Sequence, residues 1–207
     1  KDNVDCSHHI VILSDIHLPG KNLLGKEKVI EDINSWETAE MAVVLGDNVE
    51  TCGTTDEYLF AKGFLNKLRL PLKVVGGNHD YIYADGFPKD QVTGLHIKET
   101  DEKVRAVRLE RHLNTWGLDQ LYYSESLGNY LLVFLSVDGL FTNNYTEMSF
   151  RQLQWFDDLL SKNRETPAIV FFHGPLQGTY SSKRIKKTNP DSNDAEPSGI
   201  IKEILRN

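Results

Sequence analysis

Residues 72–81 read LKVVGGNHDY, and this stretch decides how the rest of the sequence is interpreted. Its first four residues are strand-like, and they run directly into two glycines followed by Asn78, His79 and Asp80. Glycine, asparagine and aspartate are ordinary turn residues, but a turn does not need a histidine. The position of His79 therefore indicates a chemical role at the end of this strand.

The first half of the chain alternates between strand and helix patterns. Apolar runs at 10–14 (IVILS) and 41–45 (MAVVL) predict two further strands that are buried on both faces. Apolar residues at helical spacing predict helices over 26–36 and 56–70, with Trp36 partly in the core. This βαβαβ order predicts a parallel sheet with right-handed crossovers.

The middle of the chain, residues 81–117, is rich in charge and has no regular apolar period. We expect an irregular insertion there, over one end of the sheet, with His96 and His112 on the surface. The segments 121–125 and 130–136 flank a Gly-Asn pair and predict a β-hairpin.

The last part of the chain returns to regular patterns. Ser149 and Gln152 form a capping-box pattern that opens a helix over 150–163. The run AIVFF at 168–172 predicts a buried strand, and a last helix is expected over 197–206.

The composition predicts a single globular domain over residues 1–207. No apolar run approaches the roughly 20 residues that span a bilayer. The formal net charge of −7 disfavours nonspecific binding to nucleic acid, which requires a basic face. Cys6 and Cys52 flank strands at opposite ends, beyond disulfide reach, so we expect two free thiols.

Four predicted strands each end in residues that can bind a metal or move a proton. Taken singly, each group is ordinary turn chemistry, and only their conjunction indicates a site, because ligands bind at the carboxyl ends of strands in α/β sheets. Asp15 and His17 are two residues apart, so in extended backbone both would point to one side. Oxygen and imidazole donors without thiolate favour Mn, Fe, Zn or Co. The four groups are Asp15 with His17, Asp47 with Asn48, Asn78 with His79 and Asp80, and His173.

These motifs resemble those of the calcineurin-like metallophosphoesterase superfamily, whose pattern is DxH, GD, GNH followed by D or E, a lone His, and GHxH. The resemblance spans residues 10–206 and includes the first four motifs. It implies an α/β fold, a four-layer αββα sandwich of two mixed β-sheets flanked by helices. It also implies a dinuclear centre with two divalent or trivalent metal ions, Mn, Fe, Zn or Co.

The resemblance also implies which residues hold the metals. Asp15 and His17 would bind the first metal, and Asp47 would bridge both metals. Asn78 and His173 would bind the second metal.

Three further residues have roles implied by their places in the motifs. His79 would be the catalytic histidine beside the leaving group. Asp80 either orients an imidazole or only caps the turn. Asn48 either touches the phosphate or is only a turn residue.

The fifth motif, GHxH, does not occur up to residue 207. The last predicted helix leads into no strand, and the motif is expected on the strand that would follow it. We therefore expect a truncated C-terminus, with natural loss of the motif as the alternative. The first residue is Lys1 and not Met, so the sequence leaves open whether a signal peptide was removed. The sequence also leaves the compartment and the oligomeric state open.

The implied activity is metal-dependent hydrolysis of a phosphoester by a hydroxide that bridges two metals. The GD motif continues as NVETCG, without the Asp-Arg-Gly of protein Ser/Thr phosphatases. Glu50 stands where purple acid phosphatases have a tyrosine. We therefore expect a bacterial-type phosphodiesterase acting on small molecules, such as cyclic nucleotides or glycerophosphodiesters. The alternatives are a phosphomonoesterase and a non-catalytic binding scaffold with a vestigial metal site.

Overall fold

The first sheet holds three parallel strands in the order β1-β2-β3. The computed structural model describes residues 8–138, 148–175, 200–201 and 203–205. The strands of this sheet are β1 (His9–Leu13), β2 (Ala39–Leu45) and β3 (Leu72–Val75). Leu13 is paired with Val44, and Leu45 with Val75, so all three strands end at the same edge of the sheet.

Two helices make the crossovers between these strands, α1 (Leu23–Asn34) and α2 (Thr55–Leu65). A capping box of Thr54 and Glu57 opens α2. The first helix ends two residues earlier than predicted, because the backbone N–H groups of Ser35 and Trp36 turn back to the carbonyls of Asp32 and Ile33. Trp36 therefore lies beyond the helix and is 53% exposed, so its predicted place in the core is wrong.

The second sheet has the order β4-β5-β6 and is mixed. Its strands are β4 (Tyr123–Leu127), β5 (Tyr130–Leu135) and β6 (Ala168–Phe172). The antiparallel β4–β5 hairpin turns at Gly128-Asn129, as predicted, and β6 runs parallel to β5. Both sheets were expected to be mixed. The first sheet is parallel throughout its described strands, so the expectation holds only for the second sheet.

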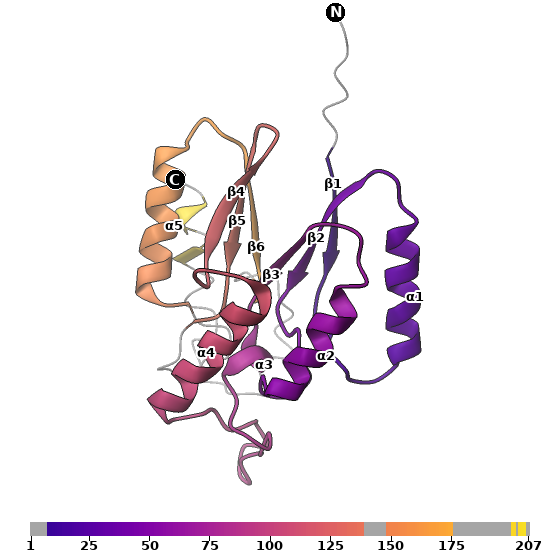
Figure 1. The fold of residues 1–207 in the computed structure, drawn as a ribbon. Helices are drawn as coiled ribbons and strands as arrows, with labels where there is room; N and C mark the ends of the chain where they lie inside the picture. Colours follow the sequence, from indigo (N-terminus) through magenta and orange to yellow (C-terminus); the bar gives the residue numbers. More distant parts are fainter. Residues whose placement is uncertain (1–7, 139–147, 176–199, 202, 206–207) are drawn as a thin grey trace, which may run out of the picture.

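The helix α5 (Phe150–Lys162) covers the outer face of the second sheet (Figure 1). The Ser149 hydroxyl caps this helix by accepting a hydrogen bond from the Gln152 N–H. The Gln152 side chain does not complete the predicted capping box. It is fully buried and bonds both the N–H and the carbonyl of Ser136, which ties α5 to the end of β5.

The two sheets pack face to face, with α1 and α2 outside the first sheet and α5 outside the second (Figure 1). This is the predicted four-layer sandwich. The side chains between the sheets are Met41, Val43, Val75, Leu132, Phe134 and Phe171. The same packing sets the carboxyl end of β6 beside those of β2 and β3.

The prediction of an irregular segment over 81–117 is wrong for its second half, which α4 (Glu102–Trp116) occupies. Asp101 caps this helix, and Gly117 ends it with a φ of 68°. The buried residues of α4 are Arg105, Arg108 and His112, and its apolar residues Leu109 and Trp116 are only partly buried. His112 is therefore a buried residue and not the predicted surface residue.

Other predictions have partial outcomes. Cys52 is a buried free thiol, and Cys6 lies outside the described residues. In the last predicted helix, the described residues 200, 201, 203 and 204 are helical, and Ile201 is buried against the second sheet. Among the described residues, no helix is both long enough and apolar enough to cross a membrane.

Candidate metal centre

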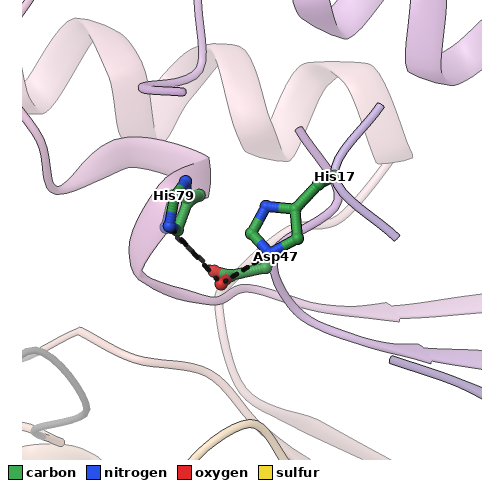
Figure 2. A group of neighbouring side chains, drawn as sticks. All are labelled: His17, Asp47 and His79. Carbon is green, nitrogen blue, oxygen red and sulfur yellow. Dashed lines mark hydrogen bonds and ion pairs between the residues drawn. The ribbon is translucent and has the colours of Figure 1, made fainter. Parts of the chain in front are cut away.

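Asp47, which follows β2, lies at the centre of the predicted site and is 4% exposed. Its Oδ2 is 3.6 Å from Nε2 of His17 and 3.8 Å from Nε2 of His79 (Figure 2). Its Oδ1 is 3.5 Å from Nε2 of His173. These separations exceed those of ordinary N–H···O hydrogen bonds. Three imidazole nitrogens therefore surround the Asp47 carboxylate at distances longer than a hydrogen bond.

Two glycines allow the loops around Asp47 to approach closely. A Cβ at Gly77 would lie 2.4 Å from both the backbone nitrogen and Oδ1 of Asp47. A Cβ at Gly46, where φ is 82°, would lie 2.7 Å from Nδ1 of His173. The backbone N–H of His79 donates to Oδ1 of Asp47 at 2.9 Å. The GD and GGNH loops thus interlock, and only glycine fits at these two positions.

Asp15 and His17 follow β1, but not in the extended backbone that the sequence analysis assumed. Their φ values are 51° and 41°, in the left-handed region. Their donor atoms therefore join different groups, each with all atoms within 4.8 Å of one another: His17 with Asp47 and His79, and Asp15 with Asp47 and His173. The two groups separate Asp15 from His17, and the assignment of both residues to one metal stays a prediction. Asp47 belongs to both groups, as a bridging residue would.

His173 follows β6 and brings a donor from the second sheet. Its Nδ1–H donates to the Leu45 carbonyl at 2.8 Å, so in the neutral ring Nε2 carries a lone pair. That lone pair faces Oδ1 of Asn78 at 3.1 Å. Two lone pairs at this distance repel each other unless a cation or a proton lies between them. The arrangement therefore fits a metal ion that accepts both nitrogen and oxygen donors.

The sequence analysis did not identify Tyr83, which fixes the amide of Asn78. The Nδ2 of Asn78 donates to the Tyr83 hydroxyl at 2.9 Å, which leaves Oδ1 directed at His173. Tyr83 is buried and lies in a charged segment without a recognisable motif. No local sequence signal could have identified its role.

His79 lies in the short helix α3 (Asn78–Tyr81), directly after β3. Its Nδ1–H donates to the Glu50 carbonyl at 2.7 Å, which directs Nε2 toward Asp47. Burial lowers the pKa of His79, and the neighbouring Asp47 carboxylate partly offsets this effect. The hydrogen bond to Glu50 therefore presents Nε2 of His79 to the site.

Asp80 and Asn48 are fully buried beneath the site. Asp80 accepts hydrogen bonds from the Gly77 N–H at 2.7 Å and from the Asn48 backbone and side chain at 3.1 and 2.9 Å. Burial, and then the charge of Asp47, raise the pKa of Asp80 to about 7. Of the two alternatives for Asp80, the structure shows the turn-stabilising one. Asn48 has no exposed surface and donates to the Val75 carbonyl and to Asp80, which favours its alternative role as a turn residue.

Comparisons with known proteins identify relatives of this chain in sequence and in fold. A family model described as calcineurin-like phosphoesterase matches residues 8–200. Over 56 residues the chain is 36% identical to the glycerophosphodiester phosphodiesterase GpdQ of Enterobacter lignolyticus (strain SCF1). The matched segment covers 27% of this chain and 20% of that protein.

The fold is similar to that of a solved structure, the purple acid phosphatase PPD1 from yellow lupin (Lupinus luteus) seeds. The TM-score is 0.55 at 14% sequence identity, and the match covers 91% of this chain and 34% of the phosphatase. Since the family model covers nearly the whole sequence, this chain belongs to the calcineurin-like phosphoesterase family.

Proposed function

We propose that this chain carries the site of a metal-dependent phosphodiesterase that acts on small molecules and uses two metal ions, Mn, Fe, Zn or Co. The observation that carries the proposal is the place of Asp47 in two donor groups at once. A single carboxylate shared by two groups of imidazole and carboxylate donors is the arrangement that a two-metal site needs. When bound, such ions neutralise charge on the phosphoryl oxygens and acidify a water molecule.

Five side chains would hold the ions. Asp15, His173 and Asn78 would serve one position, and His17 would serve the other, with Asp47 shared between them. The hydrogen bonds of Asn78 and His173 to the Tyr83 hydroxyl and the Leu45 carbonyl preset their donor atoms. Preset donors lose less conformational entropy when they bind an ion.

His79 is the proposed proton carrier. Its side chain is 18% exposed, so Nε2 can reach the leaving oxygen of a bound ester. The hydrogen bond to the Glu50 carbonyl holds the ring in place. A protonated His79 would give its Nε2 proton to the leaving oxygen, and the lowered pKa makes the proton easier to transfer.

Three observations support a small-molecule diester as substrate. The relative with 36% identity is named as a glycerophosphodiester phosphodiesterase. Glu50, at the position of the purple acid phosphatase tyrosine, accepts a hydrogen bond from the Gly20 N–H. The formal net charge of −7 opposes binding to a nucleic acid.

The test compares a diester with a monoester. Hydrolysis of bis-p-nitrophenyl phosphate and p-nitrophenyl phosphate is measured with added Mn²⁺ for the full-length gene product. We expect faster turnover of the diester. Asp47→Ala should lower it at least about 100-fold, since it removes the shared ligand. Asp32→Ala, at an exposed position of α1, is the matched control and should retain activity.

Two other results would favour the alternative functions. Faster turnover of the monoester would favour the phosphomonoesterase alternative. If calorimetry shows Mn²⁺ binding that depends on Asp47 while neither ester is hydrolysed, the binding scaffold with a vestigial site is the correct reading.

A further inference from the structure

An aromatic wall lies beside His79, built from Tyr83, Phe87 and His96. The ring centroid of His79 is 5.0 Å from that of Tyr83 and 5.1 Å from that of Phe87. Phe87 and Tyr83 meet edge to face at 5.2 Å. These separations are those of favourable aromatic pairs. The polar site around Asp47 therefore has one apolar, aromatic side, next to the proposed proton carrier.

The backbone of residues 82–99 holds this wall in place. The segment folds back on itself, with antiparallel bridges between Tyr83 and Lys98 and between Lys89 and His96. Backbone hydrogen bonds from Ala84 to residue 97 and from residue 97 to residue 88, both 2.9 Å long, support the bridges. The wall is thus part of a hydrogen-bonded hairpin.

The backbone conformation of Phe87 and its contacts with His96 restrict this residue. Its φ of 52° lies in the left-handed region, which is strained for a residue with a side chain. His96 stacks on its ring at a centroid distance of 3.4 Å and an interplanar angle of 14°. The His96 Nδ1–H also donates to the Phe87 carbonyl at 3.1 Å. His96 therefore holds both the ring and the backbone of Phe87, which remains partly exposed.

We propose that Phe87 is a specificity-determining residue that binds a flat aromatic group on the leaving side of the phosphoester. This inference rests on the proposed function, which places the phosphorus near Asp47 and the leaving oxygen near His79. The group attached to that oxygen then lies close to Phe87, whose partly exposed ring is 5.1 Å from that of His79. An aromatic group gains ring–ring contact there, whereas a short alkyl group covers less of the ring.

The test measures binding, so that it does not depend on turnover. Affinities for phenylphosphonate and ethylphosphonate, which are not hydrolysed, are compared by calorimetry in Mn²⁺ with the full-length protein, at a pH at which both are dianions. A second pair, the methylene phosphonate analogues of adenosine 5′-monophosphate and ribose 5-phosphate, tests a base reached through a sugar. Wild type should prefer the aromatic member of a pair by about 2- to 12-fold.

Two variants and a control complete the design. Phe87→Ala should abolish the preference, and Phe87→Leu should abolish most of it, because leucine is apolar and of similar size but has no flat face. The leucine variant keeps the comparison possible if the alanine variant does not fold. Val92→Ala, at a 93% exposed position of the same hairpin, should leave the preference unchanged.

The outcomes separate the two proposals. A Phe87-dependent preference in the first pair alone identifies a directly attached aryl group, and one in the second pair alone identifies a nucleobase. Lack of preference in both pairs, a preference that persists in Phe87→Ala, or failure to bind any of the four compounds overturns the role of Phe87. A protein that shows the preference but hydrolyses no ester would refute the proposed function and leave the role of Phe87 standing.

Discussion

The buried His112 of α4 leads to a prediction about acid stability. Its Nδ1–H donates to the Tyr58 hydroxyl at 2.9 Å, and that hydroxyl donates to the Asp80 carbonyl at 2.7 Å. Among the described residues, Nε2 of His112 has no hydrogen-bond partner. Burial lowers the pKa of His112 to about 3, so the folded protein holds this ring neutral.

The magnitude follows from the difference between the folded and the unfolded pKa. The unfolded chain takes up a proton on this ring near pH 6.5, whereas the folded chain does so only near pH 3. The stabilisation from His112 is therefore fully present above pH 6.5 and is lost as the pH falls toward 3. At about 1.4 kcal/mol per pH unit, acidification from pH 6.5 to 5 should remove about 2 kcal/mol of unfolding free energy.

The assay is urea unfolding followed by circular dichroism at pH 7.5, 6.0 and 5.0, for wild type and His112→Gln. The glutamine amide can still donate to Tyr58 but does not titrate. It should cost about 1 kcal/mol at pH 7.5. The fall in unfolding free energy between pH 7.5 and 5.0 should then be about 2 kcal/mol smaller than in wild type. His9→Gln, at an exposed position of β1, should retain the wild-type pH dependence.

The same pH dependence in His112→Gln and in wild type would refute this reasoning. It would mean that His112 has the same pKa in the folded and the unfolded chain, and that burial of the ring does not control its charge.

Two further predictions concern the metal site. Gly77→Ala places a methyl group 2.4 Å from two atoms of Asp47, so Mn²⁺ affinity measured by calorimetry should fall at least about 10-fold, and unfolding free energy should fall by about 1–3 kcal/mol. Gly63→Ala is the matched control, because a Cβ there meets nothing within 4 Å. Tyr83→Phe removes the oxygen that orients the Asn78 amide and should weaken Mn²⁺ binding about 10-fold without changing the circular dichroism spectrum. Unchanged Mn²⁺ affinity in either variant would contradict the role given to that residue.

The strands and the edge of the sheet could be predicted because their signals are local. Each buried strand is a short apolar run, and β3 and β6 have the predicted bounds. Parallel pairing then brings the strand ends together, whatever the details of the connections. All the predicted ligands therefore gather around Asp47 even though the loops that carry them differ from the expectation.

The helix α4 was missed because polar residues take the most buried positions on its inner face. Its buried residues are His112 and two arginines, Arg105 and Arg108, which donate to backbone carbonyls inside the protein. An apolar period cannot identify such a face. The capping residues Asp101 and Gly117 were the available signals, and they bound the helix correctly.

The assignment of donors to metals depends on backbone conformation, which spacing does not show. The DxH spacing is compatible with an extended chain, in which both side chains point to one side. In the structure Asp15 and His17 are both left-handed, and their donor atoms separate into different groups. The role of Tyr83 depends on a contact with Asn78 that forms only in the folded site.

The origin of His173 in the second sheet has a consequence for how the protein unfolds. The other proposed donors follow strands of the first sheet. An ion bound by both Asp47 and His173 would therefore connect the two sheets. A ligand at 100 times its dissociation constant adds about 2.7 kcal/mol to the stability of the state that binds it. In this fold that free energy opposes separation of the sheets. Metal supply would therefore determine whether the halves come apart one after the other or unfold in a single step.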